Sequence, residues 1–451
     1  MISWLNSSVF QFLKWIEVDR AVAYSILDKV WRLFAGLTTM LMISHFLSPE
    51  AQGFYFTFIS LLALQAFVEL GFSLVITPFA SHEWVSLSWD GKGSIRGEEK
   101  ALSRLVSLGQ LVVKWYVCAS LLLVSFVSLA GFYFFSQQPD SGIGWQEPWF
   151  VAVFLAGVQL CYLPFYSILE GCQQIKNAYL FRLIKAVFGS LAIWLVMYFG
   201  GSLWMVATTI GVGVIIDSIL VFGRYRGFFR TFISVKPTEK IDWRDEIFPM
   251  QWRIALGAIA TYFRMSIFTP IIFHYHGSVA AGKFGMTWQA IEVLGTLAHA
   301  WILPKVPRYS ILIAQKKYAE LDRYFLRNSI ISVMVVLIGA VIGLLLIYGL
   351  NEIGHHLAQR LLPPFPTAVL FLAATLIQIP NCMSSYLRCH KKDPLLGVQM
   401  GFSLSCGLSV WLLGSQYGPL GLALGFLGTV SLVLLPWESI VFYRCRKEWH
   451  R

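Results

Sequence analysis

The sequence predicts an all-α polytopic membrane protein of about twelve transmembrane helices in two six-helix bundles, with both termini in the cytoplasm. Three observations lead to this prediction. The chain is 57% hydrophobic and only 13% charged, whereas a soluble domain contains about 25% charged residues. It has about twelve apolar runs long enough to cross a hydrocarbon core of about 30 Å. Its Lys and Arg side chains gather in alternate loops between these runs.

Each apolar run has about the 20 residues that an α-helix needs to cross a bilayer. The runs give predicted spans at residues 22–46, 54–80, 105–135, 149–169, 179–199, 203–223, 250–273, 281–304, 327–350, 366–387, 395–414 and 418–442. Before the first span, apolar Phe12, Trp15 and Ile16 are interleaved with charged side chains. This pattern predicts a short helix at residues 9–20 that lies in the membrane interface.

The basic residues fix the expected orientation. The segments that follow even-numbered spans carry 25 Lys and Arg side chains, whereas the odd-numbered loops hold Arg360, with Lys283 at the edge of a span. Because cytoplasmic loops retain Lys and Arg, this bias places both termini in the cytoplasm. The net charge of +11 would suggest nucleic acid in a soluble protein. Here basic loops on anionic lipid account for it, and we expect no nucleic-acid partner.

The longest basic stretch falls between the sixth and seventh spans. It divides the chain into an N-terminal six-helix bundle with the interfacial helix (1–223), a cytoplasmic linker (224–249) and a C-terminal six-helix bundle (250–451). Residues 65–71 (QAFVELG) and 289–295 (QAIEVLG) match at four of seven positions, in spans two and eight. A duplication would give a parallel repeat; chance similarity between two apolar helices is the alternative.

Sequence motifs for catalysis are absent. The chain contains no GxxxxGK[ST] phosphate loop, no HExxH and no nucleophile elbow. Its seven cysteines show no CxxC spacing and mostly fall inside apolar runs, which is typical of small core residues rather than a metal site. We therefore expect a protein that is not an enzyme, with no catalytic residues, no cofactor and no metal.

Basic side chains inside the spans are candidates for binding substrate in a cavity. They are Arg32, Arg264, Arg253, Lys114 and Lys185. Ionisable groups at membrane depth cost roughly 2.5–3.5 kcal/mol on insertion scales, so they usually line a cavity or pair. Arg264 lies deep, with no carboxylate three or four residues away. Arginine matches phosphate oxygens with a planar fork, so the set predicts an anionic substrate.

Each of the other cations has an alternative interpretation. Asp28 is four residues before Arg32, so the two side chains could neutralise one another. The remaining three could extend to the interface with their charge in water. Among the acids, Glu69, Glu292 and Asp28 are candidates for coupling to an ion. Glu69 and Glu292 lie in the repeated segments, where each could instead be a structural hydrogen-bond partner.

The opening of the chain resembles a known family. Asp19-Arg20, Arg32 and residues 46–84 (FLSPEAQGFYFTFISLLALQAFVELGFSLVITPFASHEW) are similar to the first two helices of Wzx-type polysaccharide flippases. These flippases belong to the multidrug/oligosaccharidyl-lipid/polysaccharide (MOP) exporter superfamily. The specific part is the loop LSPEAQG at 47–53 with the helix after it. Over the rest of the chain the resemblance rests on twelve spans, two halves and length.

The resemblance implies a MATE/MOP-like fold with two six-helix bundles around a central cavity. It implies a multi-pass flippase of the bacterial inner membrane that acts by alternating access. The substrate would be an undecaprenyl-pyrophosphate-linked oligosaccharide, such as an O-antigen (lipopolysaccharide), capsule or exopolysaccharide repeat unit, moved from the cytoplasmic to the outer leaflet. The implied partners are this lipid-linked oligosaccharide, membrane lipids, a polysaccharide polymerase and a chain-length regulator.

Three other functions stay open at this point. A cation/drug antiporter of the same fold should have a cavity dominated by acids, whereas Arg and Lys outnumber acids at depth here. A membrane polysaccharide polymerase or glycosyltransferase usually needs a large outward loop, and the predicted outward loops are short. A symporter of another fold is the third alternative.

Overall fold

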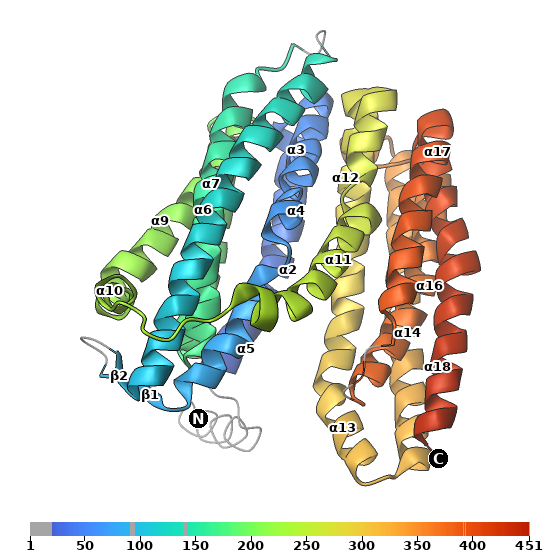
Figure 1. The fold of residues 1–451 in the computed structure, drawn as a ribbon. Helices are drawn as coiled ribbons and strands as arrows, with labels where there is room; N and C mark the ends of the chain where they lie inside the picture. Colours follow the sequence, from blue (N-terminus) through green and yellow to red (C-terminus); the bar gives the residue numbers. More distant parts are fainter. Residues whose placement is uncertain (1–19, 91–94, 139–141, 391, 393, 451) are drawn as a thin grey trace, which may run out of the picture. The chain divides into compact units, whose positions relative to one another are not determined.

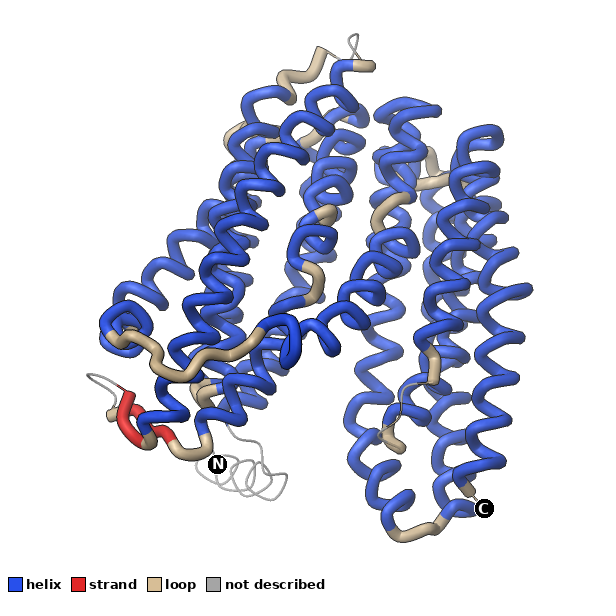
Figure 2. Tube along the Cα trace, viewed as in Figure 1, coloured by secondary structure: helices blue, strands red, loops and turns tan. Residues whose placement is uncertain are grey.

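The structure, a computed structural model, describes residues 20–90, 95–138, 142–390, 392 and 394–450. Its elements are helices apart from two short strands, as Figures 1 and 2 show. The all-α polytopic fold predicted from the sequence is therefore confirmed. The predicted interfacial helix at 9–20 falls outside the described residues except for Arg20, which begins the first described helix.

The described chain folds into two compact units. The first unit takes residues up to 46, 65–132 and 144–255, and the second takes 47–64, the described part of 133–143, and 256 onward. These units differ from a simple division at the linker, because residues 47–64 join the C-terminal helices. Elements of the first unit are α2 (Arg20–Phe46), α4 (Gln65–Glu69), α5 (Phe72–Trp84), β1 (Leu87–Trp89), β2 (Ile95–Gly97), most of α6 (Glu99–Ser136), α7 (Gln146–Gly171), α8 (Ile175–Tyr198), α9 (Trp204–Ser218), η2 (Ile219–Arg224), α10 (Arg226–Ser234), η3 (Trp243–Ile247) and the start of α11 (Phe248–Met265).

The second unit contains α3 and the helices that follow α11. They are α3 (Pro49–Leu62), α12 (Phe268–Ile302), η4 (Leu303–Lys305), α13 (Val306–Ala314), α14 (Tyr318–Glu352), α15 (His356–Gln359), α16 (Pro364–Arg388), α17 (Leu396–Thr429), η5 (Val430–Leu434) and α18 (Leu435–Trp449). Ser48 caps α3 by accepting a hydrogen bond from the Ala51 amide, and Pro49 occupies the first helical turn. Both features are typical helix-start signals.

Two glycines turn the chain inside α12 and α17. Gly277 (φ 84°) and Gly418 (φ 62°) have a backbone conformation that favours glycine. The chain reverses at Gly277, because the rings of Phe268 and Trp288, twenty residues apart in sequence, lie 5.1 Å from one another. Each of these two elements therefore takes part in two membrane crossings. The first crossing of α12 begins in α11, and the second crossing of α17 continues into η5 and α18.

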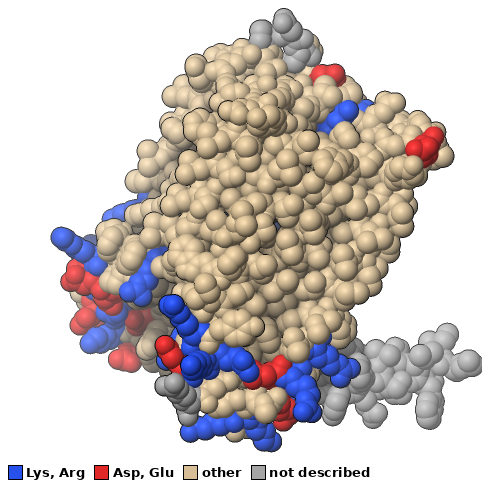
Figure 3. All heavy atoms as spheres, turned by 90° about the vertical axis from the view of Figure 1, so that its right-hand side faces the viewer, with Lys and Arg blue, Asp and Glu red and all other residues tan. Residues whose placement is uncertain are grey.

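The membrane crossings agree with the predicted spans. In the described chain, nine segments are long and apolar enough to cross a membrane, and two of them, Trp243–Ala314 and Leu396–Trp449, are 72 and 54 residues long. Dividing these two at their glycines and adding the 27-residue α2 accounts for all twelve predicted spans. In Figure 3 the middle of the face drawn is free of charged side chains; most of them gather toward its lower end, and a few lie near its upper end. Large apolar side chains are exposed on α14, such as Ile338, Leu345 and Leu346, as lipid contact requires.

The second predicted span is not one continuous helix. It consists of α3, α4 and α5, with the sharper break at Leu70 and Gly71, which both have positive φ (52° and 63°). A side chain at Gly71 would also collide with Ile254, since its Cβ would lie 2.4 Å from the Ile254 Cγ2 atom. The similar segment at 289–295 lies within the uninterrupted part of α12. The two copies of the short repeat therefore have different local structures.

The predicted cytoplasmic segments contain structure that the apolar pattern does not indicate. Residues 87–89 and 95–97 form an antiparallel hairpin, drawn in red in Figure 2. Helix α10 lies in the linker with Phe228, Phe229 and Phe232 buried. The segment after α10 is fastened to α6, where the Ser103 hydroxyl accepts a hydrogen bond from the Glu239 amide at 2.8 Å.

Within the second unit, α3 packs directly along α12. The contact depends on glycine, because a Cβ at Gly53 would lie 1.9 Å from the carbonyl oxygen of Ser278. Beside it, the buried Gln52 amide donates to the carbonyl oxygens of Gly282 at 2.8 Å and Arg360 at 3.1 Å. The Arg360 guanidinium in turn donates to the Leu47 carbonyl at 2.5 Å. This packing positions one wall of the pocket described below.

Candidate functional site

Arg32 forms an ion pair with Asp28 on α2. The Arg32 Nε atom lies 2.9 Å from the Asp28 carboxylate, and the arginine side chain is 56% exposed. At about 100° per residue, both side chains lie on the same side of α2 as buried Thr39 and opposite exposed Phe34 and Leu41. Arg32 therefore points away from the exposed apolar stripe of α2. Its charge is balanced in part by its neighbour, as the four-residue spacing indicates.

Lys185 lies in a polar cluster between α7, α8 and α9. Its ammonium is 3.0 Å from the carboxylate of Asp217, which is 1% exposed. The same carboxylate accepts a hydrogen bond from the Tyr166 hydroxyl at 2.6 Å, and the Lys185 ammonium lies 5.2 Å from the centre of the Tyr166 ring. Gly213 leaves the space that the Lys185 side chain and Gln159 occupy. Lys185 is thus neutralised by a partner that is 32 residues away in sequence.

Arg264 lies near the end of α11, in the second unit. Its Nε atom is buried without a hydrogen-bond partner among the described residues. The Glu438 carboxylate interacts with it electrostatically, as do Cys406 and Arg388. Glu438 is 3% exposed and belongs to α18. Glu438 is not among the candidate residues predicted from the sequence, since it lies close to the basic end of the last span. A carboxylate within that predicted span is nevertheless a sequence signal.

The two remaining cations are exposed. Arg253 on α11 lies over the ring of its neighbour Trp252, with 5.5 Å between the guanidinium carbon and the ring centre. Lys114 on α6 lies on the same side of the helix as Val117 and Leu121, which are also exposed. Their positions leave both available to reach water or head groups. The first unit holds Arg32, Lys114, Lys185 and Arg253, and the second holds Arg264.

Glu69 lies at the break in the second span. Its carboxylate accepts hydrogen bonds from the amide and the hydroxyl of Ser73, in the first turn of α5, and from the Tyr116 hydroxyl at 3.3 Å. The negative group therefore lies at the positive N-terminal end of a helix, where it satisfies free backbone N–H groups. This geometry accounts for a carboxylate at that position without an ion.

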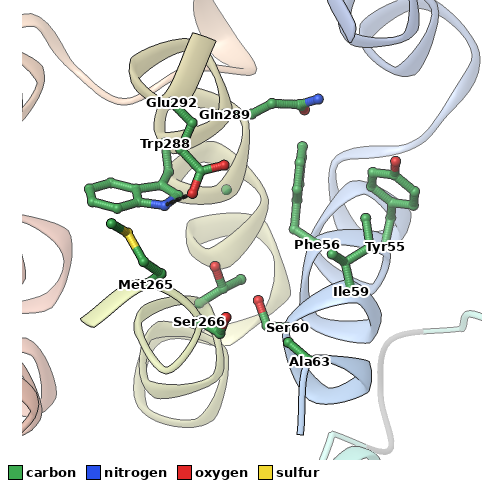
Figure 4. A pocket seen from close by; sticks show the side chains of 12 residues that line it. Tyr55, Phe56, Ile59, Ser60, Ala63, Met265, Ser266, Trp288, Gln289 and Glu292 are labelled. Atoms are coloured by element: carbon green, nitrogen blue, oxygen red, sulfur yellow. Dashed lines mark hydrogen bonds between the residues drawn. The ribbon is translucent and has the colours of Figure 1, made fainter. Parts of the chain in front are cut away.

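Glu292 lines a pocket of about 260 Å³ in the second unit, between α3, α11 and α12 (Figure 4). The Trp288 indole N–H donates to its carboxylate at 2.9 Å. The hydroxyl-bearing residues Ser60 and Ser266 and the Gln289 amide share the lining. The Gln289 Oε1 atom is buried with no hydrogen-bond partner within the described part of the chain.

The lining of this pocket is chemically suited to a proton or a small cation. It is lined by a carboxylate, hydroxyls and aromatic rings, and its described lining contains no Lys or Arg. Oxygen ligands suit hard cations, and aromatic faces attract organic cations. Of the three candidate coupling acids, Glu292 is exposed to a cavity, whereas Asp28 pairs with an arginine and Glu69 caps a helix.

Comparisons with known proteins show which solved structures share this fold. No protein-family description matches the sequence, and no curated protein matches it significantly. The chain is similar to a structure described as the inward-facing conformation of a multidrug resistance MATE family transporter of the MOP superfamily. The TM-score is 0.62 at 11% identity, over 93% of this chain and 96% of that one.

Two further solved structures are similar along almost their whole length. The lipid II flippase MurJ, in an inward closed conformation, has a TM-score of 0.61 at 11% identity, over 95% of this chain and 90% of that chain. The MATE multidrug transporter DinF-BH has a TM-score of 0.58 at 12% identity, over 96% of each chain. The protein is therefore a multi-pass membrane protein with the fold that MATE transporters and MurJ share.

Proposed function

We propose that the protein is a flippase for an anionic lipid-linked oligosaccharide. The substrate would be an undecaprenyl-pyrophosphate-linked repeat unit of an O-antigen, capsule or exopolysaccharide, moved from the cytoplasmic to the outer leaflet of a bacterial inner membrane by alternating access. The observation that supports this best is Arg264, whose buried Nε atom has no hydrogen-bond partner among the described residues. An arginine at membrane depth is costly unless a partner satisfies it, and a pyrophosphate accepts two hydrogen bonds from its fork.

Arg32 would provide a second contact for the substrate. It lies on the side of α2 opposite the exposed apolar stripe and keeps more than half of its side chain exposed. Asp28 reduces its net charge, which suits a transporter because the substrate must also be released. The polyprenyl tail would remain in lipid during transport. A polysaccharide polymerase and a chain-length regulator would act on the product in the outer leaflet.

Glu292 is the residue that we propose for coupling. The sequence has no nucleotide-binding motif, so the energy would come from an ion gradient or from removal of the product. A proton or sodium ion on Glu292 would be adjacent to Trp288 and Gln289 in the pocket (Figure 4). Purified protein in liposomes should then move a lipid-linked oligosaccharide without ATP. Strict ATP dependence in the absence of any partner would contradict the coupling proposal.

The direct test is substitution of Arg264. Arg264→Ala should abolish glycan export in cells while the protein remains inserted and elutes as a single species. Arg264→Lys should retain part of the activity, because the charge survives without the bidentate fork. Arg444→Ala is the matched control, since it removes the same charge from an exposed position on α18. If the double variant of Arg32 and Arg264 still exports glycan, these arginines are structural and the proposal fails.

A second candidate function is a cation/drug antiporter of the same fold. The Glu292 pocket favours it, because a carboxylate beside Tyr55, Phe56 and Trp288 could hold an organic cation. Proteoliposomes that expel a fluorescent organic cation along an imposed proton gradient, with Glu292→Gln inactive and Arg264→Ala active, would favour this function over the flippase. The reverse pattern, with lipid-linked substrate moved and no cation expelled, would exclude it.

A further inference from the structure

A second pocket of the C-terminal unit is chemically distinct from the Glu292 pocket. It has a volume of about 530 Å³ and lies between the end of α12, η4, α13 and the last turn of α16. Its polar lining consists of Arg388, His299, His390, Ser310 and Ser385. The volume is within the range of roughly 300–1,000 Å³ that small-molecule sites occupy.

The titratable groups in the described lining of the pocket are Arg388, two histidines and a cysteine. None of its described lining residues is acidic. The nearby carboxylate of Asp322 is already engaged, because it accepts hydrogen bonds from Arg446 at 3.1 Å and from the Tyr386 hydroxyl at 3.0 Å. Arg388 also lies within electrostatic range of a second cation, Arg264. Buried Glu438 already offsets part of the Arg264 charge, and an anion in the pocket would add to that compensation.

The polar atoms of the pocket suit a group with several acceptor oxygens. The His390 Nε2 atom is buried without a hydrogen-bond partner in the described structure, and its Nδ1 atom lies 3.3 Å from the Tyr386 carbonyl oxygen. The hydroxyls of Ser310 and Ser385 donate to carbonyls of their own helices, so both could turn toward a ligand. Arginine, histidine and serine together are typical donors to phosphate.

The surroundings of the pocket are those of a membrane interface. Trp301, Leu303 and Ile311 expose more than 40% of their surface around η4 and α13, and the Lys305 ammonium lies 5.3 Å from the centre of the Trp301 ring. Trp beside Lys is common at head-group level. These residues belong to a segment that we expect in the cytoplasm, where basic pockets between membrane helices bind anionic head groups.

We propose that this pocket binds a phosphate group, supplied by an anionic phospholipid of the cytoplasmic leaflet. Arg388 is the principal ligand of the phosphate, His390 and the two serines complete its contacts, and the acyl chains follow the exposed apolar side chains of η4 and α13. The site requires no transported substrate, so it is independent of the proposed function.

The test is a binding titration of the full-length protein in a neutral detergent, read by native mass spectrometry. The probes are phosphatidylglycerol, phosphatidylcholine and inorganic phosphate. Phosphatidylglycerol should bind selectively, and Arg388→Gln should weaken its binding about tenfold or more, as loss of a charge-assisted contact predicts. Ser310→Trp, at an exposed position of the lining, should weaken it by filling the pocket while every charge remains. Arg444→Gln is the control for general surface charge and should have little effect.

Each other outcome overturns a defined part of the proposal. If inorganic phosphate binds with the same variant pattern and phosphatidylglycerol does not, the lipid source is wrong. If Arg444→Gln weakens binding as much as Arg388→Gln, the lipid senses surface charge rather than this pocket. If Ser310→Trp and Arg388→Gln both bind phosphatidylglycerol as the unmodified protein does, the pocket is not the site.

Discussion

At the scale of single residues, the charges inside the spans differ in how far the fold has neutralised them. The Asp28–Arg32 pair follows from a four-residue spacing on one helix and is visible in the sequence. The Lys185–Asp217 pair joins two helices, and no local pattern indicates it. Arg264 is the candidate whose Nε atom is buried without a partner in the described chain, which makes it the sharpest test of a substrate role.

The Lys185–Asp217 pair should be structural. Asp217→Ala leaves the Lys185 charge in a low-dielectric site, which typically costs about 3–5 kcal/mol when a buried pair is broken. The double variant Lys185→Met with Asp217→Leu should recover much of that loss, because no uncompensated charge remains. Thermal unfolding in detergent of the unmodified protein, Lys185→Met, Asp217→Leu and their double variant measures the coupling between the two residues. Full stability of Asp217→Ala together with loss of export in Lys185→Met would instead assign Lys185 to the substrate path.

Two histidines at the cytoplasmic end should make stability depend on pH. Burial lowers the pKa of both His390 and His450. Since the folded state favours the neutral rings, their contribution is fully present above the unfolded-state pKa of about 6.5 and is lost as the pH falls through the lowered folded-state pKa.

The measurement is the Tm in detergent at two pH values. Between pH 7.5 and 5.5 the Tm should fall by about 2–4 °C, and it should fall less in His450→Gln. His450 lies 3.1 Å from the Tyr386 hydroxyl and also interacts with Asp322 and Arg446, so the comparison concerns the pH dependence rather than the absolute Tm. An equal fall in both proteins would contradict the assignment.

At the scale of elements, breaks within helices and close contacts between helices determine how the spans pack. The second span turns at Leu70 and Gly71, and Glu69 fills the resulting gap in backbone hydrogen bonding at the start of α5. Non-helical backbone at membrane depth is tolerated only inside protein or beside a water-filled cavity. The break therefore indicates that this part of the second span does not face lipid on all sides.

The addition of a single methyl group at Gly53 should weaken the α3–α12 contact. Gly53→Ala places a Cβ against the Ser278 carbonyl, a backbone group that cannot rotate away, and overpacking of this kind typically costs about 1–3 kcal/mol. Gly36→Ala on α2 is the matched control, because no atom lies within 4 Å of its added Cβ. We expect a lower Tm for Gly53→Ala and an unchanged or higher Tm for Gly36→Ala. Equal Tm values would show that the two helices are not closely packed at Gly53.

At the scale of the whole molecule, the distribution of charge determines orientation. Reporter fusions after residues 90, 235, 315 and 451 should report the cytoplasm, and fusions near residues 140 and 357 should report the outside. The expectation follows from the 25 basic residues on one side of the predicted spans. An active external reporter after residue 235 would contradict both the orientation and the predicted cytoplasmic linker.

The sequence by itself determined the fold class, the number of crossings and their approximate limits. Each of these follows from local composition, because a lipid-facing helix must be apolar for about 20 residues and its flanking charges must stay in water. The predicted first span at 22–46 corresponds to α2 (Arg20–Phe46), and the predicted ninth at 327–350 lies within α14 (Tyr318–Glu352). The candidate residues could be selected in the same way, because a charge within an apolar run is visible without a structure.

Only the tertiary structure decided what surrounds each candidate residue. It joined Lys185 to Asp217, brought Glu438 into electrostatic range of Arg264, and assembled the Glu292 pocket from α3, α11 and α12. It also broke the second span at Glu69 while its counterpart in α12 stayed continuous. The physical reason is that pairing and packing energies depend on distances between helices far apart in the chain, whereas membrane insertion depends on the residues of one helix at a time.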